Sequence, residues 1–134
     1  MVIGAEVVLA LQTIVSRKTA PGTRAVVTVG SFHAGTKHNV IGDTATLQLT
    51  VRSYEDSVRE KLLGEIRRIT LNVAAAHGAP KPPDITAPEE HTPAGYHDPA
   101  LTERVKGVFE RLLGKDLVHS VEPMMGGEDF SIFP

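Results

Sequence analysis

Two stripes of apolar residues at helical spacing dominate the hydrophobic pattern in the first half of the chain. The pattern predicts one helix from about residue 2 to Lys18, ended by Pro21-Gly22, and a second from about residue 57 to Gly78. Ser57 and Glu60 form a possible capping box for the second helix. The stripes consist of Ile3, Val7, Leu11, Ile14 and Val15 in the first helix, and of Val58, Leu62, Ile66, Ile69 and Val73 in the second.

Between these helices the pattern changes to one that is typical of β-strands. Residues 24–32, RAVVTVGSF, are rich in β-branched side chains, and residues 45–54, ATLQLTVRSY, alternate strictly between apolar and polar. In the second run Leu47, Leu49 and Val51 share one face, whereas Gln48, Thr50 and Arg52 share the other. We therefore expect a half-buried strand with one polar face. Residues 84–96, limited by prolines, predict a weak strand at a sheet edge.

The last part of the chain has a different pattern of residues. Asp98-Pro99 is typical of a helix start, and Gly114 is typical of a helix end. A short strand is predicted at residues 117–123, followed by the glycine loop MMGGEDFSIFP. The apolar stripe of the intervening helix consists of Leu101, Val105, Val108, Leu112 and Leu113.

The order of elements is α-β-β-α-β, followed by an α-β piece. This order predicts an α+β fold, an α/β sandwich in which an antiparallel-type sheet carries two helices on one face. The first part corresponds to a βαββαβ unit without its first strand. We therefore expect the chain to be a piece of a larger protein, and the open sheet edge to promote self-association.

Composition excludes several classes of function. The net charge of −2 without a basic stripe argues against nucleic acid as a partner. The opening segment is too polar for a membrane span and has its basic residues after the apolar stretch, so we expect a cytoplasmic protein that neither enters a membrane nor carries a secretory signal. There is no cysteine, and the closest histidines in the candidate loop, His33 and His38, are five residues apart. We therefore expect no metal site within this chain.

Three motifs have both a structural and a functional interpretation. Asn39, in the loop of residues 31–45, is either an ordinary turn residue or a ligand group. Arg52 is either a solvated charge or a bidentate carboxylate ligand. In MMGGEDF the paired glycines allow close approach of an anion, and Glu128 with Asp129 could act as bases, as groups behind the site or as an acidic turn.

Four separated motifs in this order resemble one enzyme family. LALQTIVSR, VTVGSFHAGTKHNVIGDTATL, TVRSY and MMGGEDFS are similar to stretches of the metal-dependent amidohydrolases that include hippurate hydrolase, aminoacylase and indole-acetyl-amino-acid hydrolase. The resemblance implies a two-domain enzyme with two divalent metals, zinc or manganese, in a zinc-peptidase-like domain. It also implies a smaller lid that mediates dimerisation. Residues 1–96 would be most of the lid, and residues 97–134 a fragment of the catalytic domain.

The resemblance assigns substrate contacts rather than catalytic groups to this chain. Asn39 and Arg52 would contact the substrate, with His33 as a weaker candidate, and Gly126, Gly127 and Glu128 would border the active site. Gly42 stands where the family usually has proline, which predicts a looser loop. The family's metal-ligand and catalytic-histidine motifs are not found in the sequence.

The implied activity is hydrolysis of the amide bond of N-acyl amino acids or similar compounds. This chain would supply the lid, substrate contacts and dimer contacts, and would be inactive alone, because the motifs for the metal and the catalytic groups are missing. The alternative is a stand-alone module that binds a small anion or forms a dimer without catalysis. We also expect a homodimer or a higher self-association.

Overall fold

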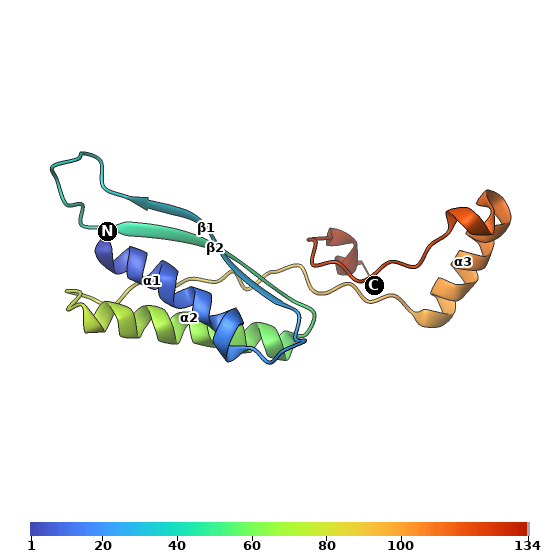
Figure 1. Cartoon of the computed structure of the whole chain (residues 1–134), viewed down its shortest axis with the longest axis horizontal. Coiled ribbons are helices and arrows are strands. Elements are labelled where there is room, and N and C mark those ends of the chain that lie inside the picture. Colours follow the sequence, from blue (N-terminus) through green and yellow to red (C-terminus); the bar gives the residue numbers. More distant parts are fainter. Residues whose placement is uncertain (134) are drawn as a thin grey trace. The chain divides into compact units, whose positions relative to one another are not determined.

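The computed structural model describes residues 1–133 and divides into two compact units, residues 1–90 and the chain from His91 onward (Figure 1). Residue 134, the last of the expected catalytic-domain segment, lies outside the described residues. The first unit contains α1 (Val2–Thr13), β1 (Ala25–Ala34), β2 (Ala45–Ser53) and α2 (Asp56–Ala76). The second unit contains α3 (Pro99–Leu113) and two short 3₁₀ turns, Lys115–Leu117 and Asp129–Ile132.

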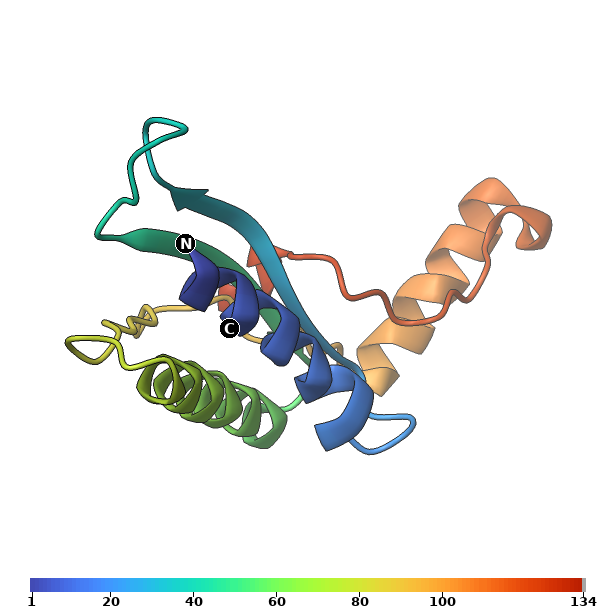
Figure 2. The ribbon, with the colours of Figure 1, turned by 60° about the vertical axis from the view of Figure 1, so that its left-hand side comes forward.

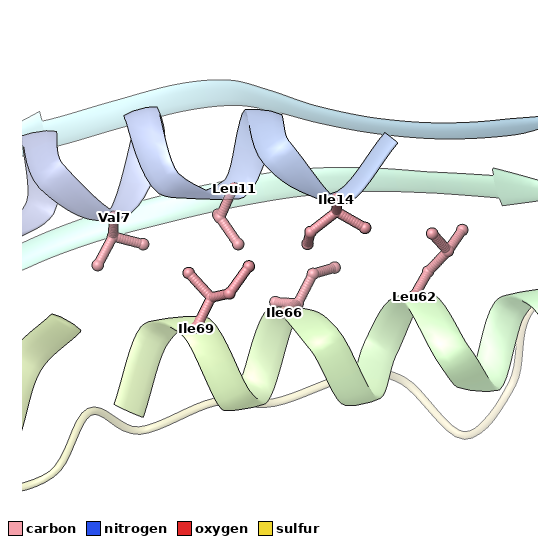
Figure 3. Packing of buried hydrophobic residues seen from close by; sticks show 6 residues of the cluster. All are labelled: Val7, Leu11, Ile14, Leu62, Ile66 and Ile69. Carbon is pink, nitrogen blue, oxygen red and sulfur yellow. The ribbon is translucent and has the colours of Figure 1, made fainter. Parts of the chain in front are cut away.

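In the first unit, α1 and α2 lie on one face of the β1–β2 ribbon, as Figure 2 shows. The strands are antiparallel and, within the described residues, form a two-stranded sheet. The helices run in opposite directions, and the side chains of their stripes point toward one another (Figure 3). This mixed α+β architecture confirms the predicted fold class, with two helices on one face of an antiparallel sheet.

The core consists of the stripe positions that the spacing predicted. The innermost residues are Val7, Leu11, Ile14, Leu62, Ile66 and Ile69. The inward residues of β2 pack against this cluster as partly buried side chains, which confirms the predicted alternation of Leu47, Leu49 and Val51. Val15, which was expected in the stripe, is instead exposed, because a π-helix, Ile14–Lys18, follows α1 and rotates the chain out of α-helical phase.

A β-bulge at Gly30 interrupts β1. Val29 pairs with Leu49 and Ser31 with Gln48, so Gly30 is the extra residue on its strand. The bulge reverses the alternation: Val29 faces the helices before it, and Phe32 packs against α1 after it, near Gly4. His33 consequently lies on the open face of the ribbon, the face that α1 and α2 leave uncovered.

The helix ends show one confirmed and one wrong prediction. Gly78 ends the α2 segment with φ +65 and donates its N–H to the carbonyl of Ala75. The predicted capping box of Ser57 and Glu60 is wrong, because α2 begins at Asp56 with Glu55 as its N-cap and no side-chain cap bond. Ser57 therefore lies within the first turn, too late in the chain to cap it.

The predicted helix start at Asp98-Pro99 is confirmed, because an Asp98 carboxylate oxygen accepts the Leu101 N–H at 2.7 Å. None of the described residues of α3 is buried, so its apolar stripe remains exposed. The predicted strands at residues 84–96 and 117–123 are wrong, since neither segment contains a strand and Leu117 ends a 3₁₀ turn. A strand needs a hydrogen-bonded neighbour, and the prolines in 84–96 remove donors from any ladder. No helix among residues 1–133 is long and apolar enough to cross a membrane.

Candidate functional site

Asn39 lies at the exposed tip of the β1–β2 loop. It is part of a turn in which the Val40 N–H donates a hydrogen bond to the Lys37 carbonyl at 3.3 Å. No described non-glycine residue has a positive φ, so Asn39 does not occupy the left-handed conformation that often selects asparagine in turns. A left-handed backbone is therefore not the reason for an asparagine at this position. Ile41, two residues after Asn39, is 90% exposed, so the tip presents both polar and apolar groups to solvent.

The loop has a narrow neck formed by Gly35 and Gly42. Gly35 has φ +78, and a Cβ built on Gly42 would lie 3.2 Å from the Gly35 Cα and 3.3 Å from its nitrogen. A side chain at Gly42 would crowd the Gly35 backbone, whereas a side chain at Gly35 would be strained by the positive φ and would lie 3.1 Å from the Met1 Cε. Sequence reasoning missed this contact, because the departure from proline at Gly42 only suggested looseness, whereas the structure shows close backbone packing.

The open face of the ribbon is polar. It carries Arg52 opposite Val26 and His33 opposite Thr46, and between them the Ser31 hydroxyl donates to the Gln48 Oε1 at 2.8 Å. Arg52 is exposed, as its place on the polar face of β2 predicted. The bulge at Gly30 brings His33 to the same face as Arg52.

The structure separates the sequence-predicted residues of the first unit into two groups. His33 and the Asn39 turn lie at the loop end of the ribbon, whereas Arg52 lies six residues along β2 from Thr46, the partner of His33. At about 3.3 Å per residue this is roughly 20 Å. One small carboxylate cannot contact both Asn39 and Arg52 of the same chain.

The glycine loop is organised by Glu128 in the second unit. A Glu128 carboxylate oxygen accepts the Phe130 N–H at 2.9 Å and so caps the turn Asp129–Ile132. The Ser131 hydroxyl donates to the Pro93 carbonyl at 3.0 Å, which ties the turn to the start of the unit. Gly126 and Gly127 are exposed, with open space where a Cβ would stand. This arrangement favours the interpretation of Glu128 as a group that shapes the loop.

A cleft of about 530 Å³ lies at the end of the ribbon remote from the Asn39 turn. The Arg24 guanidinium carbon lies 5.8 Å from the centre of the Tyr54 ring. The Tyr54 hydroxyl is buried and has no hydrogen-bond partner within the described residues. Sequence reasoning missed both residues, since only the structure shows that the Arg24 guanidinium lies near the Tyr54 ring. The cleft is lined by Pro21, Gly22, Thr23, Arg24, Tyr54, Glu55 and Val58.

On the outer side of α2, Arg68 makes a forked contact with Glu65, with Nη2 2.6 Å from Oε2 and Nε 3.2 Å from Oε1. The hydrogen bonds from Arg68 lower the pKa of the Glu65 carboxyl and raise the pKa of the guanidinium. Among residues 1–133 no three His, Asp or Glu side chains are arranged to hold a metal ion.

Residues 1–78 match the peptidase dimerisation domain of the M20 family, and this chain belongs to that family. The match covers α1, both strands, α2 and the glycine that ends α2. It confirms the resemblance to amidohydrolases that the four sequence motifs indicated.

Relatives of the chain include hydrolases with several names. It is 38% identical over 133 residues to "Putative amidohydrolase YhaA" of Bacillus subtilis, covering 99% of this chain and 33% of that protein. It is 34% identical over 134 residues to the N-acetyldiaminopimelate deacetylase of Streptococcus pneumoniae serotype 19F, covering 97% of this chain and 34% of that protein. The chain thus spans about a third of the length of these relatives.

A solved structure has the same fold. It is described as a putative aminohydrolase from methicillin-resistant Staphylococcus aureus and superposes with a TM-score of 0.74 at 31% identity. The match covers 98% of this chain and 33% of that one. The antiparallel ribbon with two helices on one face is therefore the arrangement of an amidohydrolase dimerisation domain.

Proposed function

We propose that this chain is the lid and dimerisation part of a metal-dependent amidohydrolase that cleaves the amide bond of N-acyl amino acids or similar compounds, as hippurate hydrolase and aminoacylase do. The observation that carries the proposal is the Asn39 turn. An amide that does not adopt the left-handed conformation is held at an exposed tip by a tightly packed glycine neck. Such a side chain is suited to hydrogen bonding with a ligand. Membership of the M20 family supports the reaction class.

Arg52 would bind the substrate carboxylate through a forked contact. Arg52 lies about 20 Å along β2 from the end of the ribbon that leads into the Asn39 turn, so Asn39 and Arg52 of one chain would serve different substrate molecules. In a dimer, the Asn39 turn of one copy could complete a site that contains Arg52 of the other. His33 would belong with the Asn39 group, and Gly126, Gly127 and Glu128 would border the active site from the second unit, which we assign to the catalytic domain.

The described residues do not fit the divalent metal that this chemistry requires, because they contain no group of three suitable ligands. We therefore derive no catalytic step from this chain and assign zinc or manganese binding to other parts of the enzyme. A cytoplasmic location remains a prediction.

Dimerisation would use the outer surface of the first unit. Val2 and Leu9, 68% and 67% exposed, lie with Ala5 on the side of α1 that faces away from the core. A helix that is apolar on nearly all sides is normally buried against other protein surfaces. The outer edges of β1 and β2 also have no further strand within the described residues, and such edges recruit other strands.

Sedimentation tests the assembly. We expect a concentration-dependent dimer, which Leu9→Lys should weaken by disrupting the apolar surface of α1. The matched control Ala76→Lys adds the same charge at an exposed position of α2 and should leave the dimer intact. A monomer at high concentration would contradict the proposed dimerisation.

Ligand binding tests the assignment of Arg52. In a ¹⁵N NMR titration, N-acetyl-L-alanine should shift the amide signals near Arg52, whereas N-acetyl-L-alaninamide, which lacks the carboxylate, should not. Arg52→Gln should abolish the shifts, and Arg67→Gln, an exposed residue on α2, should preserve them. Equal shifts with acid and amide would show that Arg52 does not recognise the carboxylate.

A further inference from the structure

The base of the β1–β2 loop rests on the first turn of α1. In both ribbon views the start of this helix lies beside the loop end of the ribbon (Figure 1 and Figure 2). A Cβ built on Gly4 would lie 2.7 Å from the Phe32 Cε2 and 3.2 Å from the Ala45 Cβ. Phe32 is near the end of β1 and Ala45 begins β2, so the turn contacts both strands next to the loop.

Met1 connects the same helical turn to the glycine neck. Its carbonyl accepts the Ala5 N–H at 3.1 Å, which is the first hydrogen bond of the helix. Its Cε lies 3.1 Å from the point at which a Cβ on Gly35 would stand. The tip of the loop, residues 36–41, is exposed throughout. The position of the Asn39 turn therefore depends on the neck and on the first turn of α1 that supports it.

The first turn of α1 lacks the groups that usually stabilise a helix start. The first N–H groups of a helix have no partner within it, and a capping side chain or an acidic residue in the first turn normally compensates for this. Met1, the N-cap, makes no side-chain cap bond, and the first turn contains no acidic residue. A terminal turn of this kind opens at a small cost in free energy. Opening would separate Met1 from Gly35 and Gly4 from Phe32.

The outer side of this turn belongs to the surface proposed for dimerisation. Val2 is 68% exposed and Ala5 is also exposed, whereas Gly4 is buried on the inner side against Phe32. A second copy that covers Val2 and Ala5 would lose these contacts if the turn opened. It therefore binds the closed turn more tightly than the open one, and binding shifts the population toward the closed turn.

We propose that dimerisation closes the first turn of α1 and thereby orders the Asn39 turn, so that the ligand-binding amide is held in place only in the assembled protein. The coupling runs within one chain, from the covered side of the helix through Gly4 and Met1 to Phe32 and Gly35. This inference rests on the proposed dimerisation and the proposed role of Asn39, and adds that assembly regulates the site.

NMR of the full chain, below and above the concentration at which sedimentation detects the dimer, tests the inference. In the dimer we expect the Ala5 amide to exchange with solvent about fivefold more slowly, because its hydrogen bond opens less often. The ¹⁵N heteronuclear NOE of residues 36–41 should rise over the same concentration range. Leu9→Lys, which weakens the dimer from a position more than one turn beyond Gly4, should keep both measurements at their dilute values.

Phe32→Leu distinguishes coupling through the helix from direct contact between the partner and the loop. Loss of the ring leaves a gap beside Gly4 and does not alter the outer side of α1. The variant should therefore dimerise and protect Ala5, but recover at most about half of the loop ordering, because a gap in packing does not transmit a shift. The matched control Phe109→Leu changes a ring that is 48% exposed on α3 and should behave like the wild type.

Three outcomes would overturn the inference. Full loop ordering in the Phe32→Leu dimer would show that the partner orders the loop by direct contact. A wild-type dimer in which the NOE of residues 36–41 does not rise would remove the coupling and leave the proposed dimerisation standing. A chain that stays monomeric at high concentration would contradict both the coupling and the proposed dimerisation.

Discussion

Gly35 and Gly42 pack backbone to backbone at the base of the β1–β2 loop: a Cβ on Gly42 would stand 3.2 Å from the Gly35 Cα. The two residues bring the ends of the loop together, and Asn39 lies at the opposite end of the loop. Because the tip residues 36–41 are all exposed, this neck is the contact that fixes where the turn lies.

Alanine at each glycine should disturb the loop for different reasons. Gly35→Ala places a side chain at φ +78 and 3.1 Å from the Met1 Cε, so it should lower the free energy of unfolding by about 1–2 kcal/mol. Gly42→Ala crowds the Gly35 backbone without a strained φ, so it should lower the free energy of unfolding by less. It should, however, shift the NMR amide signals of residues 36–41. Urea unfolding and ¹⁵N spectra measure the two effects. Unchanged loop signals in Gly42→Ala would show that the neck does not position the turn.

Two helix glycines should respond in opposite ways to alanine. Gly64 has open space where a Cβ would stand, so Gly64→Ala should stabilise α2 by about 0.5–1 kcal/mol. A Cβ on Gly4 would lie 2.7 Å from the Phe32 Cε2, so the same gain in α1 should be cancelled or exceeded by the displaced ring. Thermal unfolding of both variants provides the comparison. Equal stabilisation would mean that Phe32 moves away at no cost.

Leu11 and Leu9 provide a matched pair on α1. Leu11 is 1% exposed between the helices, so Leu11→Ala should cost about 2–5 kcal/mol of unfolding free energy. Leu9 points outward, and Leu9→Ala should change the stability of the monomer by no more than about 0.5 kcal/mol. Urea unfolding at a concentration below dimerisation measures both. Similar losses would contradict the packing shown in Figure 3.

The forked contact between Arg68 and Glu65 predicts a small dependence of stability on acid. Its hydrogen bonds lower the pKa of Glu65 below its usual value of 4.5. The resulting stabilisation is present above pH 4.5 and is lost as pH falls through the lowered pKa. Both side chains are on the surface, so the effect is modest. Glu65→Gln and Arg68→Gln should each flatten the stability profile below pH 4.5, and the double variant should flatten it no further; additive effects would contradict the pairing.

The chain should not bind metal tightly. Without three suitable ligands in one place among residues 1–133, zinc or manganese should show no stoichiometric binding at micromolar concentration. Isothermal titration calorimetry checks this directly. Micromolar binding at one site per chain would contradict it and would require ligands from more than one copy.

The elements that could be predicted were those with many repeated signals. Leu11 and Ile66 sit in stripes of five residues each, and the alternation of β2 extends over its length. The segments 84–96 and 117–123 looked like strands in composition alone, but a strand depends on a neighbour that local sequence does not specify. Ser57 matched the capping pattern but lies two residues after the actual N-cap, Glu55.

The candidate site was predicted only in part. The motifs suggested Asn39 and Arg52 as candidates, yet their separation depends on the register of the hairpin, and that register depends on the bulge at Gly30. In sequence, VVTVGSFHA fits a strand in either phase, so the face of His33 could not be assigned. No sequence pattern indicated Arg24, whose guanidinium the structure places near the Tyr54 ring.

Because Gly30 is an extra residue in β1, the alternation of inward and outward side chains shifts by one position at the bulge. Removing Gly30 would join Val29 directly to Ser31 and leave every inward residue inward on both sides of the splice. A deletion, normally the most disruptive change within a strand, is thus compatible with the core at this one position. The deletion would instead change the curvature of the ribbon, and hence the position of the loop relative to a ligand. Evolution could therefore redirect the Asn39 turn by gaining or losing a single codon without repacking the helices.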